Sequence, residues 1–165
     1  MNIKKISFTG MLAALIFVFT MFVKIPVFPG YVHLGDALIY IGALILGAPY
    51  AIIAGAIGEG LADVAGGYLI YAPATVVIKA LIALPFIFIR NKEALKLFSL
   101  KSVLCSIISG IITLLGYFSA DLIIANAYAF ADIPINAVQA AGSVVAFILL
   151  AVAFDKTKLL GRINI

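Results

Sequence analysis

Two carboxylates and one lysine lie within apolar stretches of the 165-residue chain. Glu59 and Asp63 are four residues apart, so on a helix they share one face. Lys79 lies in the middle of the following apolar stretch. A charge inside a membrane is costly without a partner or a water-filled cavity. We therefore expect Lys79 to pair with Asp63 or Glu59, in a role that is either structural or in contact with a substrate; the two roles are compatible.

A second polar group surrounds the start of another apolar stretch: His33, Asp36 and Tyr40. Asp36 follows Gly35, where the helix dipole favours a carboxylate, so it either caps a helix or forms a polar wall of a pocket. His33 has no ligand partners at metal-binding spacing, and no metal site is predicted. It lies either at the membrane interface or against a substrate.

Three uncharged amides, Asn126, Asn136 and Gln139, lie near the junction of the last two apolar stretches. An amide donates and accepts hydrogen bonds at once, which suits a neutral heteroaromatic ligand. Several tyrosines could stack on such a ring or belong to the aromatic belt of a membrane interface. They are Tyr31, Tyr68, Tyr71, Tyr117 and Tyr128.

The composition requires a membrane around these residues. Hydrophobic residues make up 65% of the chain and charged residues 11%, with a mean hydropathy of +1.27. A soluble domain of this size is about half apolar and about a quarter charged. At roughly 20 residues for each spanning helix, the length allows about six helices. We therefore predict an all-α integral membrane protein with six transmembrane helices in a single domain, residues 1–165.

The six expected helices cover residues 7–23, 35–49, 50–67, 74–89, 103–125 and 134–154. Only Pro49 and Tyr50 separate the second from the third. Six spans place most of the 11 basic residues on one side, which is the cytoplasmic side by the positive-inside rule. These are Lys4 and Lys5, then Arg90, Lys92, Lys96 and Lys101, then Lys156, Lys158 and Arg162. Both termini are therefore expected in the cytoplasm.

The opposite side carries the three loops with tyrosines, residues 25–34, 66–73 and 126–134. Function is therefore expected to face outward. The glycines of the third helix, Gly55, Gly58 and Gly60, do not form a nucleotide-binding motif, and we expect them to allow close helix packing. The sequence has no P-loop and no catalytic triad, so we expect neither ATP binding nor an enzyme.

Three sequence blocks resemble a known family. They are GYVHLGDA at 30–37, GAIGEGLAD at 55–63, and GYLIYAPAT at 67–75 followed by Lys79. Together they resemble the substrate-capture (S) components of energy-coupling factor (ECF) transporters, and most of all the riboflavin-type subgroup, with its pyridoxine and hydroxymethylpyrimidine carriers. The resemblance covers nearly the whole chain. It identifies the class but leaves the vitamin open.

The resemblance implies six helices in the cytoplasmic membrane of a prokaryote and an outward site near the ends of helices four to six. It also implies that the loop between the first two helices covers the ligand. The expected partners are a membrane coupling subunit and two ATPases, with no cofactor in the chain. Gly10 and Ala14 match the small-residue strip by which the first helix docks, with glycine in place of the first alanine.

Two other functions stay open from the residues alone. One is a stand-alone secondary carrier in which Glu59, Asp63 and Lys79 form a proton relay. The other is a structural or assembly subunit that binds no ligand.

Overall fold

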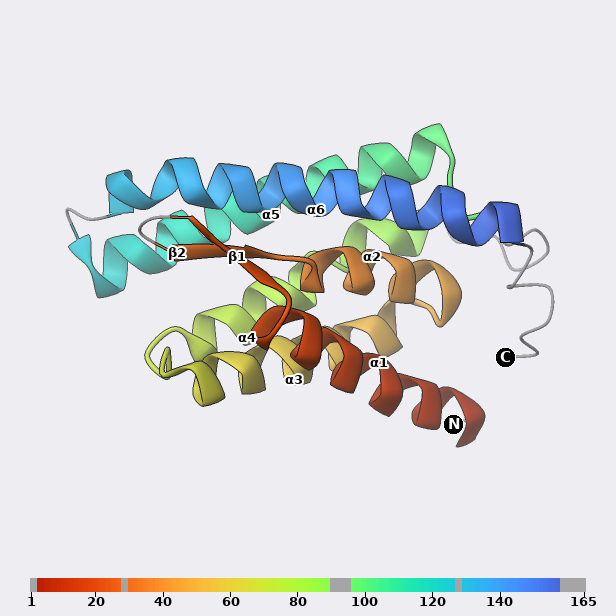
Figure 1. Ribbon diagram of the computed structural model, residues 1–165, viewed down its shortest axis with the longest axis horizontal. Helices are drawn as coiled ribbons and strands as arrows, with labels where there is room; N and C mark the ends of the chain where they lie inside the picture. Colours follow the sequence, from red (N-terminus) through yellow and green to blue (C-terminus); the bar gives the residue numbers. More distant parts are fainter. Residues whose placement is uncertain (1–2, 28–29, 90–95, 127–128, 158–165) are drawn as a thin grey trace.

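The computed structural model describes residues 3–27, 30–89, 96–126 and 129–157 (Figure 1). Nearly all of these residues are helical, because long apolar stretches in a membrane must satisfy their backbone hydrogen bonds internally. The α-helices are α1 (Ile3–Met21), α2 (Gly35–Ile45), α3 (Ala48–Gly66), α4 (Ala72–Leu81), α5 (Leu100–Ile124) and α6 (Ala129–Thr157). A 3₁₀ helix, η1 (Leu84–Phe88), follows α4, and two strands, β1 (Lys24–Val27) and β2 (Gly30–His33), connect α1 to α2.

Helix α2 lies at the centre of the bundle. It contacts α1, α3, α6 and η1, while α5 packs along α6 and α4 bridges α3 and α5 (Figure 1). Its Tyr40 is fully buried, stacks on Phe86 at 5.4 Å between ring centroids, and meets Phe147 edge-on at 5.9 Å. An 11-residue helix can be this short because protein rather than lipid surrounds it.

The glycines of α3 allow neighbouring helices to approach closely, as the sequence predicts. A Cβ atom on Gly58 would lie 2.7 Å from the backbone oxygen of Ala13 on α1. A Cβ atom on Gly55 would lie 2.7 Å from Ile39 on α2. Larger residues would therefore separate α3 from both helices.

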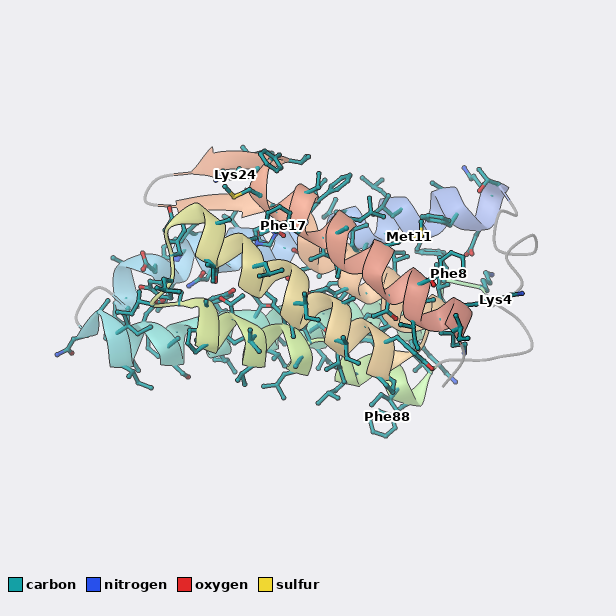
Figure 2. All side chains as sticks on the ribbon, turned by 90° about the horizontal axis from the view of Figure 1, so that it is seen from below. Lys4, Phe8, Met11, Phe17, Lys24 and Phe88 are labelled. Carbon is teal, nitrogen blue, oxygen red and sulfur yellow. The ribbon has the colours of Figure 1, made fainter. Side chains whose placement is uncertain are left out.

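Three helices, α1, α5 and α6, are long and apolar enough to cross a membrane. Figure 2 shows the side chain of Phe88 pointing away from the bundle; Phe88 is 89% exposed and Met11 of α1 is 60% exposed. The segments 35–45 and 72–88 are apolar but shorter, and α3 carries two carboxylates. This outer surface fits a multi-pass membrane protein.

The bundle has two different ends (Figure 1). The starts of α1 and α5 and the end of α6 lie at one end, which we call the terminal end. The β1–β2 hairpin, the α3–α4 connection, the end of α5 and the start of α6 lie at the other, the hairpin end. Of the basic clusters, Lys4, Lys5, Lys96, Lys101 and Lys156 lie in the described segments, whereas Arg90, Lys92, Lys158 and Arg162 lie outside them.

The helix bounds differ from the sequence prediction by a few residues, and the helix expected at 74–89 is divided into α4 and η1. The loop expected at 25–34 contains an antiparallel hairpin in which Lys24 pairs with His33 and Val27 with Gly30. The predicted all-α class is otherwise confirmed, because every other element of the described chain is helical. Helix six begins at Ala129 rather than at Pro134, which lies inside α6. Pro134 is the sixth residue of α6, and because proline has no backbone N–H it removes the helical hydrogen bond to the carbonyl of Phe130.

Candidate functional site

A buried ion-pair cluster joins three helices. Lys79 of α4 is fully buried, and its Nζ lies 2.6 Å from Oδ1 of Asp36 on α2 and 3.2 Å from Oε2 of Glu59 on α3. The predicted pairing of Lys79 with Glu59 is confirmed. The nearer partner is Asp36, which the sequence placed at a helix start without a cation.

The second carboxylate oxygen of Asp36 connects α6 to the same cluster through hydrogen bonds. Oδ2 accepts hydrogen bonds from Gln139 Nε2 at 3.3 Å and from Ser143 Oγ at 3.4 Å. A buried ion pair is tolerated when hydrogen bonds satisfy the remaining polar atoms, and Asp36 meets this condition. Its carboxylate therefore holds α2, α4 and α6 together.

Gln139 also fixes the hairpin to α6. The backbone N–H of His33 donates to Gln139 Oε1 at 2.8 Å, and Gln139 Nε2 donates to the His33 carbonyl at 3.1 Å. A side-chain amide thus pairs with the end of β2 as a neighbouring strand would. Both residues are buried, so water cannot readily replace these bonds.

The His33 ring has a defined tautomer. Its Nδ1 accepts a hydrogen bond from the backbone N–H of Gly35 at 3.1 Å, so in the neutral ring the proton lies on Nε2. Nε2 points toward Glu59 Oε2, 3.7 Å away. Burial, with further contributions from Lys79 and Lys24, lowers the pKa of His33 to about 4, so the ring is neutral at neutral pH.

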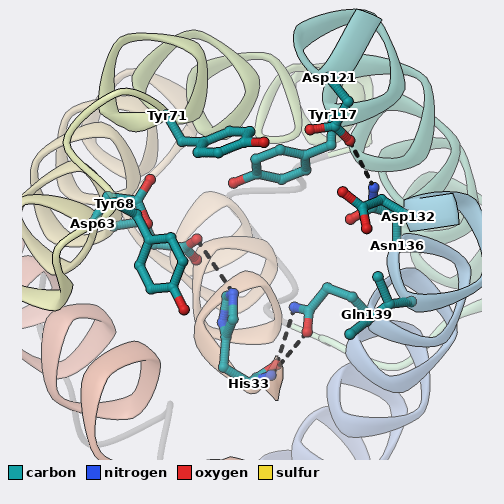
Figure 3. Close-up of a pocket in the computed structure, with 11 residues that line it drawn as sticks. His33, Asp63, Tyr68, Tyr71, Tyr117, Asp121, Asp132, Asn136 and Gln139 are labelled. Carbon is teal, nitrogen blue, oxygen red and sulfur yellow. Dashed lines mark hydrogen bonds and ion pairs between the residues drawn. The ribbon is translucent and has the colours of Figure 1, made fainter. Parts of the chain in front are cut away.

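A cavity of about 310 Å³ lies at the hairpin end, next to the ion-pair cluster (Figure 3). Its walls come from the end of β2, from α3, α5 and α6, and from the α3–α4 connection. The lining residues are His33, Glu59, Asp63, Tyr68, Tyr71, Tyr117, Asp121, Asp132, Ile135, Asn136 and Gln139. Polar and aromatic side chains therefore converge on one space from elements distant in the sequence.

Two tyrosines of the lining are held by their neighbours. The Tyr117 hydroxyl lies 3.1 Å from Thr75 Oγ1, and Lys79 Nζ lies 5.1 Å from the Tyr117 ring centroid. Burial and the adjacent carboxylates of Asp121 and Asp132 raise the pKa of Tyr71 to about 12. The carboxyl groups of Asp121 and Asp132 thus lie close enough to Tyr71 to disfavour loss of its proton.

The predicted site residues divide into two groups. Those that line the cavity are His33, Glu59, Asp63, Tyr68, Tyr71, Tyr117, Asn136 and Gln139. The others lie elsewhere: Asp36 and Lys79 are buried behind the cavity wall, and Tyr40 is in the core. Asn126 is exposed at the end of α5 with a φ of 53°. Tyr31 is in β2, where only its backbone is described, and Tyr128 lies outside the described residues.

Three lining residues were missed from the sequence: Asp121, Asp132 and Ile135. Asp121 carried a usable signal, because a carboxylate inside an apolar helix usually has a function. It is buried on α5 and accepts a hydrogen bond from Asn136 Nδ2 at 3.5 Å. Asp132 falls in the first turn of α6, where an acidic residue is common on any helix.

An apolar groove of about 680 Å³ runs between α1 and α3. Gly10 and Ala14 line it, and both are exposed. A Cβ atom on Gly10 would meet nothing within 4 Å. Packing inside the chain therefore does not explain the glycine at this position.

Comparison with known proteins identifies the family. No curated protein and no solved structure matches the chain. The family model described as "ECF-type riboflavin transporter, S component" matches residues 1–156, nearly the whole length. The chain therefore belongs to the S components of ECF-type riboflavin transporters.

Proposed function

We propose that this chain binds a small, flat-ringed, water-soluble vitamin or precursor in the cavity at the hairpin end, on the outer side of a prokaryotic cytoplasmic membrane. As a member of its family, it is a substrate-binding component of an ECF transporter. The candidates are riboflavin and compounds of the pyridoxine or hydroxymethylpyrimidine type. The supporting observation is the cavity itself, in which directed polar groups and three tyrosines line a space of about 310 Å³.

The proposed ligand contacts come from residues whose side chains line that space. Asn136 supplies an amide, Tyr68 and Tyr71 supply ring faces, and Asp63 supplies a carboxylate. Gln139 has a different role, because its amide is already bonded to His33 and Asp36. It positions the cavity wall.

The hairpin is the proposed cover of the site. Its last residue, His33, lines the cavity and is bonded to α6 through Gln139. A ligand that enters from this side would have to break the two hydrogen bonds between Gln139 and the His33 backbone, unless it passes through the part of the opening that the hairpin leaves uncovered. Exchange of the ligand is therefore proposed to be coupled to movement of β1 and β2.

The proposed orientation places the terminal end in the cytoplasm. Lys4, Lys101 and Lys156 belong to the helix ends gathered there, which agrees with the positive-inside rule. The cavity then opens to the outside, where a nutrient is first met. Cysteine labelling from outside intact cells tests this in a Cys105→Ala background. Tyr31→Cys should react, and Thr157→Cys should react only after permeabilisation.

The groove between α1 and α3 is the proposed docking site for the membrane coupling subunit, which acts with two ATPases. Small residues let helices approach closely, and Gly10 and Ala14 leave room for a partner helix. Because the sequence contains no P-loop, energy for concentrative uptake would come from those ATPases.

One observation favours a second candidate, a stand-alone proton-coupled carrier. Glu59 and Asp63, one helical turn apart on α3, each have a buried carboxylate oxygen without a hydrogen-bond partner among the described residues. These two carboxyl groups could pass a proton along α3, and Glu59 could exchange it with Lys79, whose Nζ lies 3.2 Å from Glu59 Oε2.

Uptake by cells separates the two candidates. Cells that express the chain with a coupling subunit and two ATPases should accumulate the vitamin. Cells that express the chain alone, or with ATPases lacking the P-loop lysine, should bind the vitamin without accumulating it. Accumulation by the chain alone that collapses with the proton gradient would favour the carrier.

A further inference from the structure

The cavity proposed to bind the vitamin is acidic. Four of its lining side chains are carboxylates: Glu59, Asp63, Asp121 and Asp132. No lysine or arginine is among the described residues that line it, and His33 is neutral at neutral pH. Lys79, behind the wall, is already held by Asp36 at 2.6 Å and by Glu59 at 3.2 Å.

Two of these carboxylates are incompletely satisfied. Oε1 of Glu59 and Oδ2 of Asp63 have no hydrogen-bond partner among the described residues. Their side chains belong to residues that are only 1% and 8% exposed. A buried carboxylate without a partner is costly, because burial removes the water that would otherwise solvate the charge. Either a bound proton or a positively charged group in the cavity would remove that cost.

A metal ion does not suit this arrangement. No three His, Cys, Asp or Glu side chains within the described segments are grouped closely enough to hold one. The carboxylates instead surround the cavity, with the Tyr71 and Tyr117 rings between them (Figure 3). Aromatic faces attract organic cations through the ring quadrupole. A volume of about 310 Å³ is at the lower end of ligand pockets, which are roughly 300–1,000 Å³.

We infer that the vitamin captured here is an organic cation, a one- or two-ring nitrogen heterocycle that carries a positive charge at neutral pH. This inference rests on the proposed function and narrows its substrate class. The positive charge would lie among Asp63, Asp121 and Asp132, and the ring would pack against Tyr71 and Tyr117. Asn136, bonded to Asp121, would complete the polar side of the site.

The test is calorimetric titration of the full chain, purified in detergent at pH 7.5 after any bound compound has been removed. Thiamine and pyridoxamine are the cationic probes, riboflavin and pyridoxine the neutral ones, and pantothenate the anionic one. Pyridoxamine and pyridoxine differ only by an amine in place of a hydroxyl. We expect a cationic probe to bind most tightly, and pyridoxamine to bind at least about 10-fold more tightly than pyridoxine. Salt should weaken the binding of the cation.

Variants that remove a single negative charge show which carboxylates bind the cation. Asp121→Asn and Asp132→Asn should each weaken binding of the cation by about 10- to 150-fold, the range for a hydrogen bond to a charged group. Asp155→Asn is the matched control, because Asp155 accepts bonds from Leu97 N and Phe98 N near the terminal end. It should leave the affinity unchanged.

The outcomes distinguish this inference from the function on which it rests. Tightest binding of riboflavin, pyridoxine or pantothenate would overturn the cationic assignment while supporting vitamin capture. Unchanged cation affinity in both cavity variants would also overturn it. If no probe binds, mass spectrometry of the compound released on purification decides: a cation supports the inference and a neutral compound or anion overturns it. If no compound is released either, the proposed function fails with it.

Discussion

The amide of Gln139 forms two hydrogen bonds with the backbone of His33, a residue 106 positions earlier in the chain, at 2.8 Å and 3.1 Å. This pairing fixes the end of the hairpin to α6 where the cavity begins. The same amide reaches Asp36, so the hairpin and the buried ion-pair cluster share one residue. The hairpin, which is the proposed cover of the site, and the core of the bundle are thus directly connected.

Gln139→Ala should therefore loosen the hairpin. The variant removes the two hydrogen bonds that Gln139 forms with the buried backbone of His33, at a cost of about 1–3 kcal/mol for each bond lost. Thermal unfolding in detergent should show the loss of stability, and hydrogen exchange should be faster in residues 30–33. Asn136→Ala is the matched control on the same helix, because it removes only a 3.5 Å bond to Asp121. Equal exchange rates in wild type and Gln139→Ala would contradict the role given to this amide.

Lys79→Met should destabilise the protein by about 3–5 kcal/mol, because it leaves Asp36 and Glu59 buried without their cation. Lys101→Met, at an exposed position, should change stability by less than about 0.5 kcal/mol. Because the two residues are in contact, the Asp36→Asn and Lys79→Met effects should be non-additive by about 0.5–3 kcal/mol. Additive effects in the double variant would mean that the pair is not coupled.

Lowering the pH should destabilise the protein through His33. The pKa of this residue is about 4 in the folded chain and about 6.5 in an unfolded one, so below pH 6.5 the unfolded state binds the extra proton. The free energy of unfolding should therefore fall by about 3 kcal/mol from this residue alone as the pH drops from about 6.5 to about 4. Melting curves across this range test the effect. His33→Asn, which keeps an acceptor for the Gly35 N–H, should show a flatter pH dependence; an unchanged slope would assign the effect to other groups.

Gly10 should be dispensable for folding and required for transport. Gly10→Ala should stabilise the isolated chain by about 0.5–1 kcal/mol, because alanine favours a helix and its Cβ meets nothing within 4 Å. Gly10→Leu should abolish uptake and leave vitamin affinity nearly unchanged, because the larger side chain would separate the docking helices. Met11→Leu, exposed on the same helix, should transport normally. Normal uptake by both Gly10→Leu and Ala14→Leu would remove this groove from docking.

The helical bundle and part of the site can be predicted from the sequence on physical grounds. Apolar length and the basic clusters indicate helices, and a lysine in a membrane demands a carboxylate, so the sequence predicts that Lys79 pairs with Glu59 or Asp63 and leaves the choice between them open. Asp36 could not be assigned to Lys79, because α2 is apolar all round and has no periodicity to show which face meets α4. The sequence therefore allowed Asp36 only as a helix cap or a cavity wall.

The role of Gln139 was hidden for a related reason. The segment 25–34 contains two prolines and reads as an irregular loop, so no strand end was expected for an amide to pair with. Without such a strand, the Gln139 amide had no expected partner within the chain, so a contact with the ligand was predicted for it. Asn136, three residues earlier on α6, does line the cavity with an amide that reaches only Asp121, at 3.5 Å. Only the three-dimensional placement of β2 separates these two residues.

The most direct test of vitamin capture in this cavity is native mass spectrometry of the purified chain. Wild type and Gly10→Leu, altered at the opposite end, should each carry one small heterocyclic compound for each chain. Asn136→Trp, which fills the cavity while keeping α6 intact, should carry none. A wild-type chain that never binds such a compound, or an Asn136→Trp variant that binds it as fully as wild type, would contradict the account.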